Sequence, residues 1–272
     1  MKWILCFLSL FTFPLAADMP KTAILGAMPQ EIALIRDQLR NPIEHHLGQL
    51  TFWEGTLHGH PVVLALSGIG KVAAATTTTL LLHRFHCDRL LFTGVAGSAD
   101  PTLAIGDIVI SSHLVQHDYD ASPILLPLHV DRMTSDLLPA HVHWGHTALA
   151  AANACLARGV VQADVLAPFG ITAPKAVLGI IASGDQFIHS ADHLSAIRTR
   201  VLNGSARSLA CVEMEGAAVA QVCHLFDVPF LVIRTISDQA DSNAHIDFIP
   251  FVDSVASRYS AALVEALLIP QL

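Results

Sequence analysis

The chain has 272 residues, a formal net charge of −8, 53% apolar residues and only 14% charged residues. A chain of this length and composition can bury a large core, which excludes an intrinsically disordered protein. The net charge is negative, and the chain lacks the basic patch expected of a nucleic-acid-binding protein, so we expect no nucleic-acid partner. No internal repeat or low-complexity linker interrupts the chain, and we expect one domain over residues 21–270.

Residues 1–17 differ in composition from the rest of the chain. Met1 and Lys2 precede a mostly apolar run that ends in Ala16 and Ala17. One positive charge, a short apolar region and a small-residue end are typical of a secretory signal peptide, and the run is too short to span a membrane comfortably. We expect cleavage near Ala17, export to a bacterial periplasm and no membrane association afterwards. The alternative is an apolar extension of a cytoplasmic protein.

Apolar periodicity along the rest of the chain predicts strands alternating with helices. The predicted strands are residues 21–26, 52–57, 62–66, 90–92, 108–115, 178–182 and 230–233, and the predicted helices are residues 28–39, 71–85, 131–157, 191–201 and 251–268. A further helix of small residues follows Glu215 and stops before Pro229. This alternation predicts a single-domain α/β fold, a three-layer sandwich whose central twisted sheet is mixed, largely parallel and covered by helices.

Two glycine-containing segments follow predicted strands, a tight turn at residues 67–70 and a glycine turn at residues 93–97. The first precedes Lys71 but lacks the Walker spacing, and no Ser or Thr follows the lysine. A phosphate-binding loop of that kind is therefore excluded.

Cysteine and histidine positions indicate neither an obligatory disulfide nor a metal site. The cysteines that follow residue 17 are Cys87, Cys155, Cys211 and Cys223. They allow three pairings, none of them selected by the sequence. His141, His143 and His146 are poorly spaced for chelation from a helix, so we predict no metal.

Polar residues gather at two points near the C-terminal strand. A carboxylate pair precedes the small-residue helix, and an arginine, a serine and an aspartate follow the strand at 230–233. In chain order, they are Glu213, Glu215, Arg234, Ser237 and Asp238. Each acid alone suits the capping of a helix. Together, at strand ends where α/β sheets bind ligands, they indicate a functional site.

Several segments resemble the nucleoside phosphorylase and nucleosidase superfamily, and within it the 5′-methylthioadenosine/S-adenosylhomocysteine nucleosidases. The matching segments are AILGAMPQE (23–31), SGIGKVAAA (67–75), TGVAG (93–97), GDIV (106–109), SGDQFI (183–188), VEMEGAA (212–218) and VPFLVIRTISD (228–238). They occur in the family order and cover roughly residues 22–268. The resemblance implies an enzyme that hydrolyses the bond between adenine and a 5′-thio-substituted ribose. It also implies that this enzyme is a homodimer and needs no cofactor.

The resemblance also implies catalytic roles. Asp238 would protonate adenine N7, with Ser237 orienting its carboxyl group. Glu31 would bind and activate the attacking water, with support from Arg234. To donate a proton at neutral pH, Asp238 needs a pKa well above its ordinary value of ~3.9.

Substrate contacts follow from the same resemblance. Glu215 would accept hydrogen bonds from the ribose hydroxyls, and Met214 would pack on the sugar. Phe187 would stack on adenine, and the backbone of Ile188 would read the edge of the base. The remaining predicted substrate-binding residues are Glu213, Val95, Ala96 and Gly97. Val95 departs from the family pattern, in which many members carry serine.

Water is the expected nucleophile. Related phosphorylases bring arginines to the turn after the first strand, whereas here the turn is uncharged and then acidic at Glu31. A carboxylate repels phosphate but can activate water. The alternatives are a hydrolase of aminodeoxyfutalosine or adenosine, a phosphate-dependent purine nucleoside phosphorylase, and an exported nucleoside-binding protein without catalysis. In the family, the region of residues 121–130 reaches across a dimer interface towards the 5′-alkylthio pocket.

Overall fold

The computed structural model describes residues 19–204, 207–240 and 248–269, so the predicted signal peptide lies outside the described residues. The strands are β1 (Thr22–Gly26), β2 (Arg40–Leu47), β3 (Leu50–Leu57), β4 (His60–Leu66), β5 (Arg89–Ser98), β6 (Ile108–Gln116), β7 (Leu138–Pro139), β8 (Ala176–Ser183), β9 (Leu209–Glu213) and β10 (Phe230–Asp238). The helices are α1 (Pro29–Gln38), α2 (Lys71–His83), α3 (Val142–Ala157), α4 (Ala163–Leu166), α5 (Ala191–Leu202), α6 (Gly216–Leu225), α7 (Phe248–Phe251) and α8 (Ser257–Leu268). A 3₁₀ turn at Ala167–Phe169 follows α4, and a π-helical segment at Val252–Ala256 joins α7 to α8.

The strands form one mixed sheet in the order β10-β6-β8-β9-β5-β1-β4-β3-β2, with β7 beside β6. Parallel pairs join β1 to β4 and β5, β5 to β10, and β8 to β6 and β9. Strands β2, β3 and β4 form antiparallel hairpins. Because β5 pairs with both β9 and β10, the part of the sheet from β5 to β10 closes on itself. The predicted α/β fold with a mixed central sheet is confirmed.

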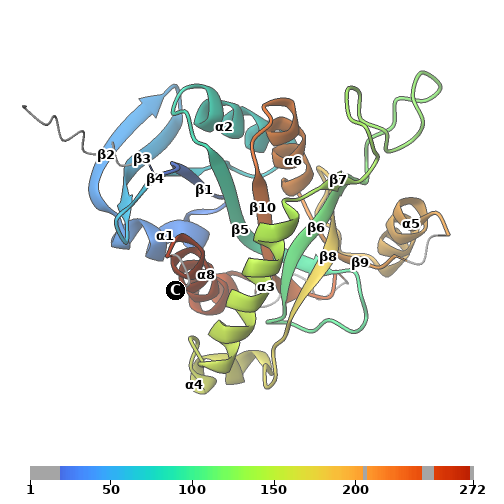
Figure 1. The fold of residues 1–272 in the computed structure, drawn as a ribbon. Coiled ribbons are helices and arrows are strands. Elements are labelled where there is room, and N and C mark those ends of the chain that lie inside the picture. Colours follow the sequence, from blue (N-terminus) through green and yellow to red (C-terminus); the bar gives the residue numbers. More distant parts are fainter. Residues whose placement is uncertain (1–18, 205–206, 241–247, 270–272) are drawn as a thin grey trace, which may run out of the picture.

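Helices cover the sheet on both faces (Figure 1). On one face α1 and α3 pack against α8, and on the other α2 packs against α6, while α5 lies beside β9. Between these layers the strands bury side chains such as Ile24, Leu91 and Leu231 completely. Full burial of one such side chain contributes roughly 1.5–3 kcal/mol, so the central strands carry much of the stability.

Two central strands are longer than predicted. Residues 93–97 continue β5 instead of forming a turn, and β10 continues beyond residue 233 to Asp238. The two strands pair in parallel from Leu90 with Phe230 to Gly97 with Asp238, so backbone hydrogen bonds extend both of them past their apolar runs. The polar residues Arg234 to Asp238 are therefore part of a buried strand.

The helix predicted over residues 131–157 begins only at Val142. Pro139 lies in the short strand β7, and the His141 side chain accepts a hydrogen bond from Trp144 N at 3.1 Å, which caps the start of α3. Strands β2 and β9 were not predicted. β2 is largely exposed and lacks an apolar run, and β9 is short and leads directly into the acidic pair.

Candidate active site

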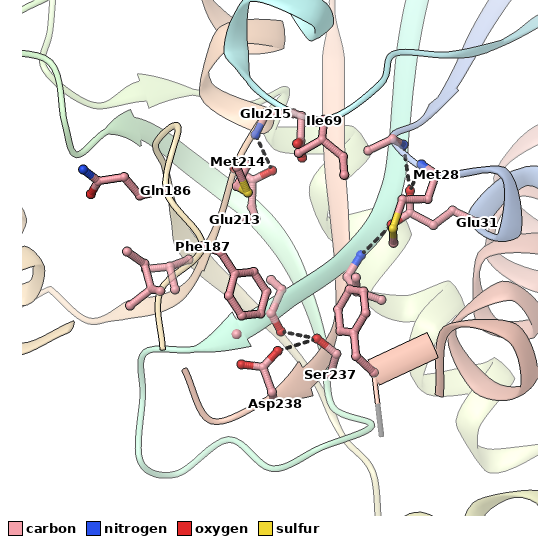
Figure 2. A pocket seen from close by; sticks show the side chains of 17 residues that line it. Met28, Glu31, Ile69, Gln186, Phe187, Glu213, Met214, Glu215, Ser237 and Asp238 are labelled. Carbon is pink, nitrogen blue, oxygen red and sulfur yellow. Dashed lines mark hydrogen bonds between the residues drawn. The ribbon is translucent and has the colours of Figure 1, made fainter. Parts of the chain in front are cut away.

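A cavity opens at the carboxyl ends of β1, β5, β8, β9 and β10 (Figure 2). Most of the residues predicted from the sequence line it. They are Glu31, Val95, Ala96, Gly97, Phe187, Ile188, Glu213, Met214, Glu215, Ser237 and Asp238. Segments that lie far apart in the chain thus meet at one edge of the sheet.

The cavity is also lined by residues that the sequence analysis did not select, namely Ala27, Met28, Ile69, Gln186, Val212 and Phe248. Met28, Ile69 and Gln186 lie inside the segments that carry the family resemblance, which was the available signal. Phe248 opens α7, and its ring centroid is 6.3 Å from that of Phe187 in an edge-on arrangement. No local pattern distinguishes Phe248 from a core aromatic residue.

Glu31 is fixed by three backbone N–H groups. It lies in the first turn of α1, as predicted, and is buried. One carboxylate oxygen accepts hydrogen bonds from Ala27 N at 2.7 Å and Met28 N at 2.9 Å, and the other accepts one from Val95 N at 3.2 Å. Burial raises the pKa of Glu31, and the charge of Arg234 and the N–H donors only partly oppose this effect. A carboxylate held in this way can orient a water molecule and accept its proton.

Asp238 lies at the end of β10, across the cavity from Glu215 in Figure 2. Ser237 Oγ donates a hydrogen bond to Asp238 Oδ2 at 2.7 Å, and Ala240 N donates one to Oδ1 at 2.8 Å. A Cβ atom on Gly97 would approach Oδ1 to 2.8 Å, so only glycine leaves room for the carboxyl group. The carboxyl group of Asp238 is therefore held in a fixed orientation.

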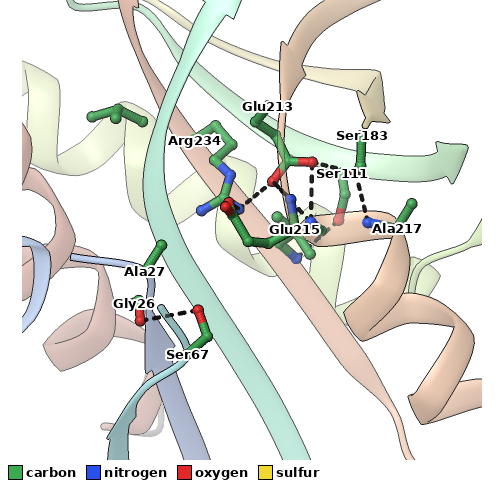
Figure 3. Close-up of polar contacts among 12 residues, drawn as sticks. Gly26, Ala27, Ser67, Ser111, Ser183, Glu213, Glu215, Ala217 and Arg234 are labelled. Atoms are coloured by element: carbon green, nitrogen blue, oxygen red, sulfur yellow. Dashed lines mark hydrogen bonds and ion pairs between the residues drawn. The ribbon is translucent and has the colours of Figure 1, made fainter. Parts of the chain in front are cut away.

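Arg234 does not line the cavity and lies next to Glu213 and Glu215 (Figure 3). It forms a buried ion pair with Glu213, and one guanidinium nitrogen is 3.6 Å from Glu215 Oε2. Its Cζ atom lies 4.0 Å from the centroid of the Phe92 ring. Burial alone would lower the pKa of Arg234, but the surrounding carboxylates raise it above its ordinary value. Arg234 is therefore a permanent positive charge beneath the acids.

Glu213 lines the cavity, but its carboxylate accepts hydrogen bonds from other groups of the protein. It accepts hydrogen bonds from Ser183 Oγ and Arg234, from Glu215 N at 3.1 Å and from Gly216 N at 2.8 Å. The last two donors are at the start of α6, where a negative charge complements the helix dipole. Glu213 thus fixes both Arg234 and the position of α6.

Glu215 offers a carboxylate to the cavity. Gly70 N donates a hydrogen bond to its Oε1 at 2.8 Å. Burial and the negative charge of Glu213 raise the pKa of Glu215 to about 7, against the opposing charge of Arg234. The geometry suits acceptance of hydrogen bonds from hydroxyl groups of a ligand.

Phe187 and Ile188 lie in the loop that follows β8. Phe187 keeps 47% of its surface exposed, and its ring points into the cavity in Figure 2. An exposed aromatic face of this kind suits stacking on a planar base. Ile188 is buried beside it and also lines the cavity.

Within the described residues, no group of three or more histidines, cysteines or acids could hold a metal ion, and no helix is long and apolar enough to cross a membrane. The four cysteines after residue 17 are free and buried. Burial raises the pKa of the Cys87 thiol to about 12, which makes this thiol unreactive at neutral pH.

Comparison with known proteins identifies the family. The sequence profile of the phosphorylase superfamily matches residues 21–269. A 5′-methylthioadenosine/S-adenosylhomocysteine nucleosidase from Anoxybacillus flavithermus is 37% identical over 245 residues, which cover 90% of this chain and 96% of that protein.

Solved structures agree with this similarity. The 5′-methylthioadenosine/S-adenosylhomocysteine nucleosidase from Neisseria meningitidis, in complex with methylthio-immucillin-A, superimposes with a TM-score of 0.78 and 34% identity, covering 92% of this chain and 98% of that chain. A futalosine hydrolase of Helicobacter pylori gives a TM-score of 0.73 and 33% identity, covering 92% and 97%. The chain therefore belongs to the phosphorylase superfamily and, within it, to the family of 5′-methylthioadenosine/S-adenosylhomocysteine nucleosidases.

Proposed function

We propose that the protein hydrolyses the N-glycosidic bond of 5′-methylthioadenosine and S-adenosylhomocysteine, releasing adenine and the 5-thioribose product. The observation that carries this proposal is the charge of the cavity. Its described lining includes four acids and no lysine, arginine or histidine. Such a lining repels phosphate and can activate water, which favours hydrolysis over phosphorolysis. The family membership supports the adenosine thioether as substrate.

Departure of adenine requires a proton donor, and Asp238 takes this role. As the bond between C1′ and N9 breaks, its electrons move into the base, which accepts a proton at N7 from Asp238. Ser237 Oγ donates a hydrogen bond to one carboxyl oxygen and Ala240 N donates one to the other, which together fix the carboxyl group beside the cavity.

The ribosyl carbon left behind becomes positively charged and is attacked by water. Glu31 binds this water and accepts its proton, while Glu215 accepts hydrogen bonds from the ribose hydroxyls. Arg234 balances part of the negative charge of both acids. This arrangement places negative charge where positive charge develops, which lowers the barrier.

The remaining predicted residues bind the substrate. Phe187 stacks on adenine, and the backbone of Ile188 pairs with its edge. Met214 packs against the sugar beside an apolar floor. That floor is formed by Val95, Ala96 and Gly97 of β5. Glu213 acts through Arg234 and the start of α6, because its oxygens are already engaged by protein donors.

A homodimer is part of the proposal. Exposed apolar side chains occur on the first turn of α2 and in the loop at 121–130, including Val72, Ile124 and Leu126. Apolar surface beside a cavity commonly marks an interface. A second copy seated there would close the cavity around the 5′-substituent.

Export to a periplasm is also proposed, from the composition of residues 1–17. Expression of the full chain in a bacterium, followed by fractionation and N-terminal sequencing, tests it. We expect periplasmic protein that starts at or near Asp18. Uncleaved protein confined to the cytoplasm contradicts export.

An adenine-release assay tests the proposed activity. The purified protein is given 5′-methylthioadenosine, S-adenosylhomocysteine, aminodeoxyfutalosine or adenosine, each with and without inorganic phosphate. We expect the first two to be cleaved fastest and phosphate to make no difference. Faster cleavage of aminodeoxyfutalosine or adenosine would reassign the substrate. Dependence on phosphate would identify a phosphorylase, and the absence of any cleavage would indicate a binding protein.

A further inference from the structure

Three charged residues form a closed set of contacts beside the cavity, through their side chains and the backbone N–H groups of Lys71 and Asp185. Lys71 Nζ lies 2.6 Å from Asp118 Oδ1, and Asp118 Oδ2 accepts a hydrogen bond from Asp185 N at 2.9 Å. The carboxylate of Asp185 in turn accepts a hydrogen bond from Lys71 N at 2.7 Å. We call this set the Lys71–Asp118–Asp185 ring. It joins the start of α2, the residues just after β6 and the loop just after β8.

Two members of the ring, Lys71 and Asp185, lie close in the chain to residues that contact or line the cavity. Gly70, immediately before Lys71, donates its N–H to Glu215 at 2.8 Å. Asp185 lies two residues before Phe187, in a loop at 184–190 that has no regular secondary structure. Gly184 N donates a backbone hydrogen bond to Glu213 O at 3.1 Å at the start of this loop. From Asp185 onward, the contacts of the ring help to place the Phe187 ring relative to Glu215.

Close packing leaves the loop little freedom. A Cβ atom on Gly70 would lie 3.0 Å from Asp185 Oδ1, and one on Gly184 would lie 2.3 Å from His117 Nε2. Lys71 Nζ also donates to Gln116 Oε1 at 3.1 Å. The Lys71 and Asp118 side chains are only 16% and 21% exposed, so water screens their attraction less than that of a surface pair.

We propose that Lys71, Asp118 and Asp185 are positioning residues that hold the Phe187 loop at the correct distance from Glu215. This inference rests on the proposed function, because it assumes that Phe187 stacks on the purine. The loop contacts the base alike in the substrate and in free adenine. Loosening the ring therefore weakens the binding of both and changes the bond-breaking step less.

Substitution of Lys71 tests the proposal. Lys71→Met removes the ammonium group but keeps an unbranched side chain. We expect the KM for 5′-methylthioadenosine and the Kd for adenine to rise about tenfold, while kcat changes by less than about threefold. Lys71→Arg restores the charge and is expected to recover most of the affinity. Kinetics and calorimetric titration with adenine measure these quantities.

Lys21→Met is the matched control. Lys21 Nζ lies 2.7 Å from Glu54, an ion pair of similar length at the opposite end of β1 from the cavity. We expect this variant to keep the wild-type KM and adenine Kd. Equal values in the Lys71→Met and Lys21→Met variants would overturn the proposal. A fall in kcat with unchanged KM and Kd would also overturn it, since that pattern indicates a loss of folded enzyme.

If Lys71→Met does not fold, Asp185→Ala provides the same test at an exposed side chain. A raised adenine Kd supports the ring, and an unchanged one overturns it. Adenine binding needs no turnover, so the two hypotheses can fail separately. A wild-type protein that binds adenine but cleaves neither nucleoside contradicts the proposed function and leaves the ring to be judged by the adenine Kd.

Discussion

In the described part of the chain, Arg234 is the positive charge that faces three carboxylates, those of Glu31, Glu213 and Glu215, which raise its pKa. When all three acids are ionised, negative charge is in excess in a region that water hardly reaches. A proton on one acid relieves the repulsion, and burial raises the pKa of both Glu31 and Glu215, that of Glu215 to about 7. The site is therefore arranged for function at some cost in stability.

Glu215→Gln should make the empty protein more stable at pH 8. The pKa of Glu215 is about 7 in the folded protein, against an ordinary value of 4.5, so the folded state binds an extra proton between these values. The stabilisation from this proton is fully present below pH 4.5 and is lost as the pH rises through 7. Glutamine remains neutral and avoids the loss. We expect the Tm at pH 8 to rise by about 4 °C.

The advantage of glutamine should narrow as the pH is lowered from 8 to 5, which thermal unfolding across this range measures. The Glu215→Gln variant should largely lose adenine release at every pH, because glutamine accepts hydrogen bonds from the ribose hydroxyls less strongly than a carboxylate does. A Tm at pH 8 below that of the wild-type protein would contradict a raised pKa for Glu215.

Asp238→Asn should abolish the chemical step while leaving the cavity intact. Asparagine has the same shape but no acidic proton, and loss of a general acid costs about 10²–10⁴-fold in rate. We expect a fall of this size in kcat, with adenine still bound. Asp192→Asn, an exposed acid in the first turn of α5, is the control and should keep wild-type kcat. Retention of kcat within about tenfold by Asp238→Asn would exclude the proton-donor role.

At the scale of elements, the close approach of β5 and β10 makes Gly94 a sensitive position. A Cβ atom there would lie 2.3 Å from Arg234 Nη1 and 2.7 Å from Glu31 Oε1. Gly94→Ala must therefore push apart Arg234 and Glu31, the acid proposed to bind the attacking water. We expect a loss of about 1–3 kcal/mol in stability from overpacking, and a kcat/KM lower by about 10²-fold from misplacement of Glu31.

Gly145→Ala is the matched control for this substitution. Gly145 lies within α3, and its nearest neighbour would be 3.5 Å from an added Cβ atom. The change should stabilise the protein by roughly 0.5–1 kcal/mol, because alanine suits a helix interior better than glycine. Denaturant unfolding and adenine release measure both effects. Equal activity of the two alanine variants would show that the contacts at Gly94 do not control Glu31.

The apolar pattern predicted the alternation of strands and helices, but it misplaced ends that depend on partners distant in sequence. Residues 234–238 carry polar side chains, yet they continue β10 because β5 pairs with them. The helix at 131–157 was too long, since periodicity does not reveal that residues before Val142 pair with β6 or cap the helix. Element type followed from local sequence, whereas length followed from pairing.

The site was predicted more fully than the ends of its strands. Its acids and Phe187 lie in segments that resemble a known family, so their grouping in one cavity could be expected. The hydrogen bonds that Glu213 accepts within the protein could not be predicted, because their donors Ser183 and Arg234 lie on other strands. Phe248 was missed for a similar reason, since its proximity to Phe187 exists only in the folded chain.

At the scale of the whole molecule, exposed apolar side chains adjoin residues that lie beside the cavity. Val72 is 78% exposed in the first turn of α2, next to the Lys71–Asp118 pair from which the loop at 121–130 departs. Figure 1 shows this loop extending away from the body of the molecule. A segment that extends outward with exposed Ile124 and Leu126 gains from burial against a second copy.

Val72→Asp should therefore separate the proposed homodimer into monomers. A carboxylate in an apolar contact would be desolvated without a partner, which destabilises the association by several kcal/mol. We expect light scattering after size exclusion to report a monomer, and the KM for 5′-methylthioadenosine to rise because the second copy no longer covers the 5′-substituent. Ile43→Asp is the control, since Ile43 is 59% exposed on the peripheral strand β2. A variant at Val72 that remains dimeric, or a wild-type protein that is monomeric, would contradict an interface at the start of α2.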